Sequence, residues 1–559
     1  MHQRRIRVWL AGVMALLALT LPAVGHAAYI ANIRLMYDGP QHFRNWERAY
    51  VDFDYHITAP EGAHFRVRPY AGGEPVEGFI WSGCPVIPAG TGSLCTWWSM
   101  PSGETIVDQY HIAMFSADWS TTYLEILLPV NYVFGECGLF DIQMSHRSPS
   151  WLAHGEHLAV DFQYASDQVS GVRIVAAPYH QGALCSGYGC SASPLLPASG
   201  SGSLWLTFPG ADADVDQVRF TMYTADWGVE LLEFFVPVNL HWRPYGISNV
   251  TFDPPSPNGL HHWDHLTATF DYYSPDAFRV WAQPYTDGEH TPHWAAQSGA
   301  GVPAGSGTLS RWCTVASGDA WVDEVHLVMR RVDSDDLLLE VAVPSRFHYG
   351  ADAVRNIQFT PPGPAILTHD ERVDTSFDYT TAESGGARIF NMPYSAGGAC
   401  PNCSAGGSPL YPFGTGSGAN YFGITSGEEY VDQLRYYMTD AAQTETLYEI
   451  FLDTRYWFGT SGVFTAAPET PPAAAVLGPC YPNPFNPATT IPVTLNEARR
   501  VTLRVYDLRG RLVATLADGW LDAGAHALPF RAEGLPSGVY LYALDAGGER
   551  RTGRMVLLK

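Results

Sequence analysis

The residues best placed to do chemistry are His261, His262, Asp264 and His265, which lie within five consecutive positions. Imidazole and carboxylate groups at this spacing can bind a metal ion. Acid–base pairs aligned with Asp264-His265 occur at three other places: Glu47-Arg48, Glu156-His157 and Glu371-Arg372. Because a metal site would not tolerate arginine, we expect these pairs to have a structural or surface-charge role. His261 and His262 are then adventitious ligands at most, and we predict no metal-binding residues.

These pairs belong to a unit of about 108 residues that occurs four times. The segments that end at Tyr70, Tyr179, Tyr285 and Tyr394 are similar, in steps of 109, 106 and 109 residues. Solenoid repeats span about 20 to 50 residues, so a unit of this length can close its own core. We therefore expect four independent domains arranged as beads on a string, with the ranges 28–134, 135–242, 243–349 and 350–459.

Each repeat has the pattern of an antiparallel β-sandwich of immunoglobulin-like size. Short β-branched and aromatic runs such as TATFDYY and LEFFVPV alternate with turn sequences such as PAGTG and PASGSG. Residues 28 to 457 contain no long amphipathic helix pattern. The cysteine and tryptophan signature of true immunoglobulin domains is missing, so we predict the all-β sandwich fold and not that family.

The nine cysteines fit an oxidising compartment. Three close pairs follow the Pro-Tyr of repeats 1, 2 and 4, where a disulfide could staple a loop: Cys84 with Cys95, Cys185 with Cys190, and Cys400 with Cys403. Cys137, Cys313 and Cys480 have no obvious partner. The spacing of Cys400 and Cys403 would also suit a redox site, but no helix N-terminus in a βαβ setting accompanies it.

No catalytic constellation is visible, and we expect the protein not to be an enzyme. One aspartate recurs in each repeat, as Asp108, Asp216, Asp323 and Asp432. One carboxylate per domain cannot form the carboxylate pair of a glycosidase. The GTGS-like sequences recur as turns and lack the partnered histidine of a nucleophile elbow.

Other recurring residues suggest packing and recognition. Met114, Met222, Met329 and Met438 are expected in cores. Glu125, Glu233, Glu340 and Glu449 should lie on an outer face or at a domain seam. Exposed tryptophan can stack on sugars or anchor a partner, so the candidate binding residues are Trp97, Trp98, Trp119 and Trp227, with core packing as the competing role.

The N-terminus predicts export. Arg4, Arg5 and Arg7 precede an apolar run from Val8 to Leu21 and a small-residue exit at residues 25–27. This is the pattern of a secretory signal peptide over residues 1–27. No later segment is long and apolar enough to span a membrane, so we expect no transmembrane segment in the mature chain.

Charge limits the choice of partners. The net charge of -24 disfavours nucleic acid and anionic membranes, because both are polyanions. Residues 211–217, ADADVDQ, have acids but lack the glycine and distal glutamate of a calcium loop. We expect no cofactor, with calcium left open.

The composition changes at residue 460. Residues 460–478 are rich in Pro, Ala and Thr and are predicted to form an extended linker. The last 80 residues or so have strand patterns at VTLRVYDL, ALPFRA and GVYLYALDA. Two motifs stand out in this segment: Tyr481-Pro482-Asn483-Pro484-Phe485-Asn486-Pro487 and Gly534-Leu535-Pro536-Ser537-Gly538-Val539-Tyr540.

With these motifs, residues 479–559 resemble the type A C-terminal sorting domain of type IX secretion, itself similar to the immunoglobulin-like domain of flagellar hook-capping proteins. The resemblance implies a small β-sandwich that engages the type IX secretion machinery after passage through the periplasm. It further implies release from the cell or attachment to its surface. Cys480, directly before the motif, has no explanation.

The four repeats look similar to uncharacterised tandem β-sandwich units of surface-exported bacterial proteins. We expect a non-enzymatic adhesion or binding array with a glycan or protein ligand, because similar domains multiply weak contacts. The alternatives are a structural spacer or coat component and, less favoured, a glycan-processing hydrolase.

Overall fold

A computed structural model describes residues 28–37, 39–191, 194–464, 475–477, 485, 487–495, 499–507, 512–521, 524–532, 534–536, 538–546 and 549–557. The described residues form two compact units, divided at Thr465. All regular structure in them is β-strand, as predicted, and they include no helix long and apolar enough to span a membrane. The predicted signal peptide lies outside them.

Repeat 1 places two sheets face to face around one core. One sheet contains β1 (Ala28–Leu35), β3 (Ala49–Ile57), β7 (Gly90–Ser99) and β6 (Ile80–Trp81). The other contains β2 (Pro40–Arg44), β9 (Thr122–Gly135), β8 (Thr105–Ser116), β4 (Ala63–Ala71) and β5 (Glu74–Pro75). Alternation explains the packing: in β3, Ala49, Val51 and Phe53 are buried and their neighbours turn outward.

The same order of strands recurs in the three following ranges. Residues 138–243 contain β10 (Gly138–Met144), β12 (Leu158–Ala165), β16 (Ser199–Thr207) and β15 (Gly189–Cys190), opposite β11 (Ser150–Ala153), β18 (Glu230–Arg243), β17 (Ala213–Thr224), β13 (Val172–His180) and β14 (Ala183–Leu184). Residues 246–350 contain β19 (Gly246–Asp253), β21 (Leu266–Ser274), β25 (Gly305–Val315) and β24 (Trp294–Ala296), opposite β20 (Asn258–His261), β27 (Leu337–Gly350), β26 (Ala320–Arg331), β22 (Phe278–Thr286) and β23 (Glu289–His290). Residues 353–458 contain β28 (Ala353–Thr360), β30 (Val373–Thr381), β34 (Gly414–Ile424) and β33 (Cys403–Ala405), opposite β29 (Ala365–Leu367), β36 (Thr446–Phe458), β35 (Glu429–Asp440), β31 (Ala387–Ser395) and β32 (Gly398–Ala399).

The repeats are not beads on a string, because sheets continue from one repeat into the next. The second sheet of repeat 1 joins the first sheet of repeat 2 where β2 pairs with β10. Strands β11 and β19 join repeats 2 and 3 in the same way. Repeats 3 and 4 approach through Gly259 and Val354 and through an ion pair of 2.9 Å between Arg355 Nη1 and Asp264 Oδ2.

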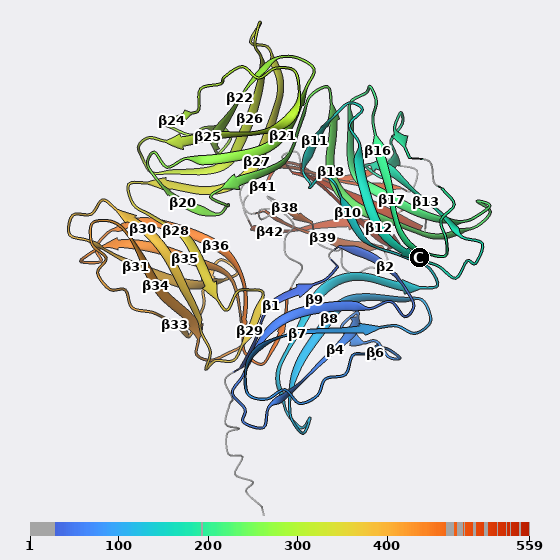
Figure 1. Ribbon diagram of the computed structural model, residues 1–559, viewed down its shortest axis with the longest axis horizontal. Coiled ribbons are helices and arrows are strands. Elements are labelled where there is room, and N and C mark those ends of the chain that lie inside the picture. The colour runs from blue at the N-terminus through green and yellow to red at the C-terminus, as the bar shows by residue number, and fades with distance from the viewer. Residues whose placement is uncertain are drawn as a thin grey trace, which may run out of the picture. The chain divides into compact units, whose positions relative to one another are not determined.

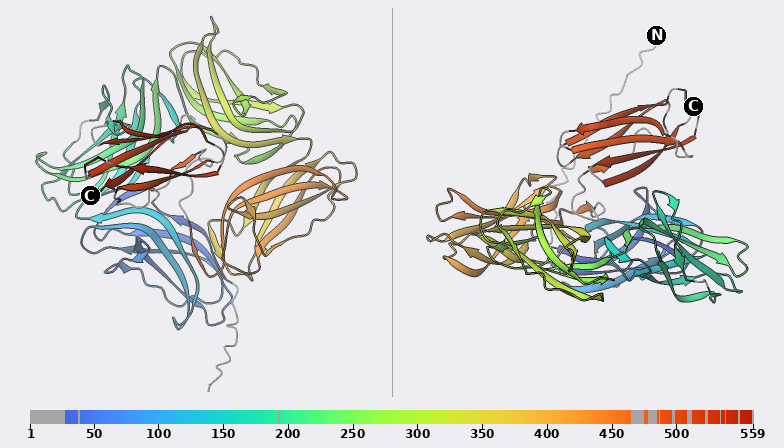
Figure 2. Two further views of the ribbon diagram at one scale, coloured as in Figure 1. Left: turned by 180° about the vertical axis from the view of Figure 1, so that it is seen from behind. Right: turned by 90° about the horizontal axis from the view of Figure 1, so that it is seen from above.

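The last junction closes the series. Strand β29 of repeat 4 pairs with β1 at the start of the described chain, with Ile366 opposite Ile30. The backbone N–H of Thr368 donates to the carbonyl of Ala28 over 2.9 Å, which fixes the register. The four repeats therefore form a closed cycle, which Figures 1 and 2 show from the front and from behind.

The start of the predicted linker also takes part in the closure. Strand β37 (Ser461–Val463) pairs in parallel with Glu125–Leu127 of β9, and Phe464 is 1% exposed in the core of repeat 1. Farther along, β38 (Ala475–Leu477) pairs with β39 (Ala488–Leu495). The linker prediction was therefore wrong for these residues, while residues 465–474 and 478 lie outside the described ones.

The second unit has two sheets of its own, visible in the right-hand view of Figure 2. One contains β38, β39 (Ala488–Leu495) and β42 (Gly524–Arg531). The other contains β41 (Leu512–Leu521), β40 (Arg499–Asp507), β43 (Gly538–Ala546) and β44 (Glu549–Leu557). Between them lie Ile491, Leu503, Phe530 and Leu557, all 2% exposed or less.

Candidate functional site

The recurring acid–base pairs hold stacked side chains. The basic member lies over an aromatic ring of the neighbouring strand in every repeat, at distances of 4.1 Å for Arg48 on Trp97, 4.1 Å for His157 on Trp205, 3.9 Å for His265 on Trp312 and 4.5 Å for Arg372 on Tyr421. Arginine and histidine both stack on aromatic faces, which explains why the position accepts either.

The two remaining histidines of the first cluster bind backbone carbonyls. His261 Nδ1 lies 2.9 Å from the carbonyl of His262, and His262 Nε2 lies 2.7 Å from that of Gly318. No group of three or more His, Cys, Asp or Glu side chains arranged to hold a metal ion is found in the described part of the chain. The cluster is thus engaged in local hydrogen bonds.

The recurring aspartates hold turns. Each accepts a hydrogen bond from a backbone N–H in the turn after the Pro-Tyr sequence: Asp108 from Gly72 at 2.8 Å, Asp216 from Gln181 at 2.6 Å, Asp323 from Asp287 at 2.7 Å and Asp432 from Ala396 at 2.9 Å. The recurring methionines are fully buried, as predicted.

The recurring glutamates pair with a basic side chain, histidine or arginine, on the adjacent strand. Glu125 lies 3.1 Å from His111, Glu233 3.2 Å from Arg219, Glu340 2.7 Å from His326, and Glu449 accepts from Arg435 Nε at 2.7 Å. The hydrogen bond from His111 lowers the pKa of Glu125. These are cross-strand pairs on one sheet face.

The predicted disulfides are absent. All eight described cysteines are free thiols: Cys84, Cys95, Cys137, Cys185, Cys190, Cys313, Cys400 and Cys403. Closeness in sequence does not bring the thiols together, because the loop crosses from one sheet to the other. Cys185 follows β14 and Cys190 lies in β15, and Cys400 follows β32 and Cys403 lies in β33, in each case in different sheets.

The remaining thiols are held separately. Cys95 lies opposite Asp52 in the β3–β7 ladder, and the Cys84 thiol donates to the carbonyl of Pro85 over 3.2 Å. Burial raises the pKa of Cys313 and of Cys400 to about 12. Cys480 lies outside the described residues.

The four candidate binding tryptophans have different surroundings. Trp98 is fully buried in the core of repeat 1, so its prediction as a binding residue was wrong. Trp97 is half-buried beneath Arg48. Trp119 and Trp227 are 41% and 47% exposed at the tips of the β8–β9 and β17–β18 hairpins. Trp119 stacks on His64 at 4.3 Å, and the Arg173 guanidinium lies 5.2 Å from the Trp227 ring.

Exposed tryptophans also occupy an unusual backbone conformation. Trp46, Trp119, Trp227 and Trp263 have φ of 78°, 63°, 66° and 70°. Bulky side chains rarely adopt this left-handed region, which costs on the order of 1–3 kcal/mol. Trp46 and Trp263 are 65% and 64% exposed, and neither was singled out from the sequence. The position corresponding to them in repeat 2 is Gly155, which adopts φ of 81° without that cost.

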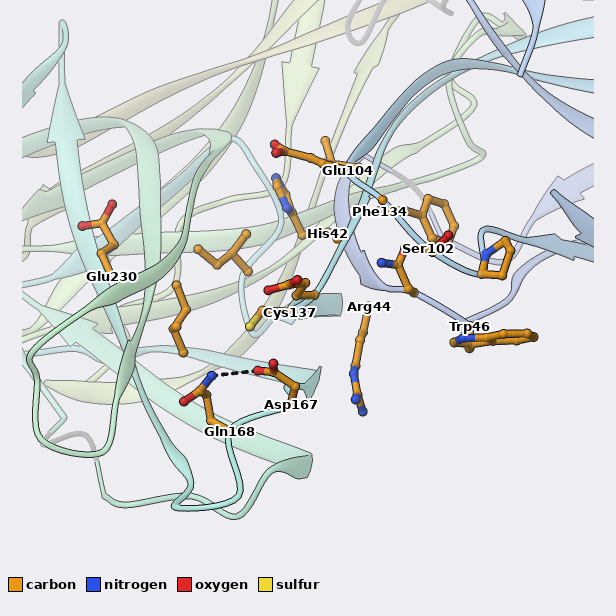
Figure 3. Close-up of a pocket in the computed structure, with 18 residues that line it drawn as sticks. His42, Arg44, Trp46, Ser102, Glu104, Phe134, Cys137, Asp167, Gln168 and Glu230 are labelled. Carbon is orange, nitrogen blue, oxygen red and sulfur yellow. Dashed lines mark hydrogen bonds between the residues drawn. The ribbon is translucent and has the colours of Figure 1, made fainter. Parts of the chain in front are cut away.

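A groove of about 680 Å³ lies where repeat 1 meets repeat 2 (Figure 3). Its walls come from the end of β2 with Asn45 and Trp46, the loop 101–104, the end of β9 with residues 135–137, residues 167–168, and the start of β18. Glu104, Glu136, Asp167 and Glu230 supply carboxylates and Arg44 a guanidinium. The Gln168 amide donates to Asp167 over 2.8 Å.

The groove exists because a small residue stands at the seam. Register aligns Val133 with His241, His348 and Trp457 of the other repeats. His241 stacks on Trp151, and His348 lies between Trp321 and Tyr448. Val133 cannot occupy that volume, and repeats 1 and 2 instead touch where His42 stacks on Phe234 at 4.8 Å. Burial lowers the pKa of His42 to about 4. Comparing the sequences YVFG, LHWR, FHYG and YWFG could have found this position.

Two aromatic residues of the C-terminal motifs lie in the core of the second unit, while Pro487, Gly534, Pro536 and Gly538 are exposed. Phe485 is 2% exposed, packs on Phe530 at 5.9 Å and bridges to Leu557. Tyr540, at the start of β43, is 4% exposed and donates its hydroxyl to the carbonyl of Pro536 over 2.9 Å. Pro487, Gly534, Leu535, Gly538 and Val539 are also described. Tyr481, Pro482, Asn483, Pro484, Asn486 and Ser537 lie outside the described residues.

Residues 479–558 match the model of the "Secretion system C-terminal sorting domain" family. The C-terminal segment is a sorting domain of this family. The match supports export by type IX secretion and placement at the cell surface or outside the cell. It also implies contact between the sorting domain and the type IX secretion machinery.

Other comparisons leave the repeats without a defined relative. No curated protein matches the chain. The native E. coli alpha-2-macroglobulin structure is 11% identical, with 95% of this chain and 40% of that chain covered and a TM-score of 0.16. The periplasmic chaperone SfaE is 10% identical over 37% of this chain and 98% of its own, with a TM-score of 0.13. The ICAM-5 D1-D4 fragment is 12% identical over 75% and 99%, with a TM-score of 0.14. At these TM-scores the likenesses carry no argument.

Proposed function

We propose that the protein is a non-enzymatic binding or adhesion protein, delivered by type IX secretion, whose exposed tryptophans bind glycans. The observation that supports this proposal is the set of four exposed tryptophans in the left-handed region. Glycine would fit there at lower backbone cost, so each tryptophan must offset that cost by its contacts. Strained backbone clusters at ligand contacts, and an indole face stacks well on a sugar ring.

Placement in separate repeats favours multivalency. Trp46 and Trp119 belong to repeat 1, Trp227 to repeat 2 and Trp263 to repeat 3. Linked weak sites can raise avidity by about a hundredfold or more without new contacts. The recurring aspartates accept hydrogen bonds from backbone turns and do not form carboxylate pairs, which is consistent with a binding role and not with glycoside hydrolysis.

The binding proposal is tested with the mature chain, residues 28–559, on a glycan array and on intact cells. Replacing the four tryptophans with glycine should abolish saturable binding without loss of fold, because glycine suits a positive φ. A matched control replaces the half-buried Trp205, which stacks on His157, with phenylalanine. If the wild-type protein binds no glycan and no cell, the structural spacer becomes the better hypothesis.

The sorting domain is tested separately. Residues 479–559 fused to a periplasmic reporter should carry it out of a type IX secreting cell. Phe485→Ala should prevent this by loosening the core of the sorting domain. A reporter that stays periplasmic with the native sequence would contradict the assignment of export.

A further inference from the structure

An extended segment that follows repeat 4 adds to a sheet edge of repeat 1. In β37, Ser461, Gly462 and Val463 lie in parallel beside Glu125, Ile126 and Leu127 of β9. The N–H of Glu125 donates to the carbonyl of Thr460, and the N–H of Phe464 donates to the carbonyl of Leu127. The first half of β9 therefore has an edge that accepts a peptide strand.

Repeat 2 has the equivalent edge without such a strand. The ladders place Glu233 and Phe235 of β18 where Glu125 and Leu127 stand in β9. The short strand β11 covers only Leu240 to Arg243 of β18. In the described residues no strand pairs with the outer side of Glu233–Phe235. Val229 and Phe235 are 57% and 38% exposed along this edge.

The equivalent edge of repeat 4 is covered by side chains instead. Arg346 donates to the carbonyl of Phe451 over 3.0 Å, and His348 Nδ1 lies 2.7 Å from the carbonyl of Glu449. In repeat 3 the equivalent residues are Glu340–Ala342 of β27, and in the described residues no strand pairs with their outer side. The equivalent edges of repeats 1 and 4 are therefore covered, as unpaired strand edges usually are, and the edge of repeat 2 differs from that of repeat 3 by the groove beside it.

The groove next to the free edge adds room for a side chain. A Cβ at Gly462 would lie 2.5 Å from Trp457 and 2.7 Å from Ile126, so only glycine fits in the segment that follows repeat 4. Val133 replaces that tryptophan at the seam of repeats 1 and 2, and it lines the groove together with Leu231 and Leu232. A peptide on β18 can carry a larger apolar residue at the position of Gly462.

We propose that the edge Glu233–Phe235 of β18 binds an extended peptide segment of a partner protein as an added parallel strand. Main-chain hydrogen bonds would hold the peptide, and the groove would select an apolar side chain at the position equivalent to Gly462. This is the usual division of roles when a peptide extends a sheet. Trp46 also lines this groove, whereas Trp119, Trp227 and Trp263 do not. Binding of a peptide strand goes beyond the proposed glycan binding.

The test uses the mature chain, residues 28–559, and two labelled hexapeptides in fluorescence polarisation. One is Gly-Thr-Ser-Gly-Val-Phe, the sequence of residues 459–464, and the other has leucine in place of the second glycine. Both should bind saturably with a Kd below about 1 mM, and the leucine peptide should bind more tightly. Val133→Trp should abolish the preference for leucine and leave the glycine peptide bound.

A proline substitution tests the main-chain contact. Glu233→Pro removes an N–H that points away from β17, and should weaken both peptides by about tenfold. The matched control is Glu449→Pro, the same change at the equivalent position of repeat 4, which should leave both affinities unchanged. Circular dichroism checks that both proline variants fold. If Glu233→Pro does not fold, the effect of Val133→Trp on peptide preference still tests the proposal.

The outcomes separate this site from the glycan site. The variant with glycine in place of Trp119, Trp227 and Trp263, which do not line the groove, should bind both peptides normally. Failure of the wild-type chain to bind either peptide overturns the inference, whatever the glycan array shows. Binding with equal affinity for both peptides, unaffected by Val133→Trp and Glu233→Pro, overturns it as well, because the peptides would then be bound elsewhere.

Discussion

Replacing Phe464 with alanine should destabilise repeat 1, although Phe464 follows repeat 4 in the sequence. The side chain is 1% exposed in the core that contains Phe65 and Met114. Its ring lies 5.7 Å from that of Tyr430, and the Arg455 guanidinium lies 5.1 Å from it. Truncation of a buried phenylalanine costs about 3–5 kcal/mol, from lost burial and the cavity left behind. The backbone bonds of β37 would remain, so we expect a loss in this range and not more.

The assay is guanidinium unfolding of residues 28–559, followed by tryptophan fluorescence. Because a chain of several domains need not unfold in one step, each transition is compared with its wild-type counterpart. Phe413→Ala is the control, since Phe413 is 65% exposed and its truncation should change stability by less than about 0.5 kcal/mol. A Phe464→Ala loss below about 1 kcal/mol would refute the burial of this segment in the core of repeat 1.

Three further predictions concern the seams and the thiols. Gly259→Ala should cost about 1–3 kcal/mol of unfolding free energy in denaturant titration, because its Cβ would clash with Tyr448 Oη and the carbonyl of Val354. Gly397→Ala is the comparison variant: its Cβ meets no atom within 4 Å, so it tests backbone strain alone. The pKa of His42 is lowered to about 4 in the folded chain, so as the pH falls the unfolded chain is protonated at this histidine before the folded chain is. Stability should therefore be greatest above about pH 6.5 and fall toward pH 4. His42→Gln should reduce this fall, measured as the unfolding midpoint at each pH. Thiol titration of the native protein should label the exposed Cys95, Cys190 and Cys403 and spare the fully buried Cys313 until denaturant is added; intact disulfides on non-reducing peptide mapping would contradict this.

The strands and their buried faces could be predicted from sequence because they depend on local alternation. The recurring methionines and the alternating residues of β3 are buried for this reason. Disulfides could not be predicted from cysteine spacing, because the intervening loop changes sheets, as between Cys400 and Cys403. Burial of Trp98 beside the half-buried Trp97 follows from the same alternation, since neighbours in a strand point to opposite faces.

The strained backbone of the exposed tryptophans and the presence of the groove could not be predicted from the sequence of any single repeat. The backbone strain at Trp46 and Trp263 depends on turn geometry that composition does not reveal. The groove depends on Val133 being smaller than the residues at the same position of the other repeats. The C-terminal segment was recognisable because its motifs are matched as a whole over residues 479–558.

Two segments of the chain, β1 and the segment that follows repeat 4, could each pair with the edge of β29, and β1 occupies it. Ser461-Gly462-Val463-Phe464 resembles Cys137-Gly138-Leu139-Phe140, where repeat 2 begins, so the chain after repeat 4 starts like a fifth copy. The place for such a strand beside β29 is already held by β1. Strand β1 is longer and is fastened to β3, where the Asn32 amide donates to Asp54 over 2.8 Å. The later segment can then only cover the edge of β9. Repeats joined by the same head-to-tail contact build an open filament unless the rotation from one repeat to the next brings the last repeat back to the first. The pairing of β29 with β1 shows that four copies complete the turn.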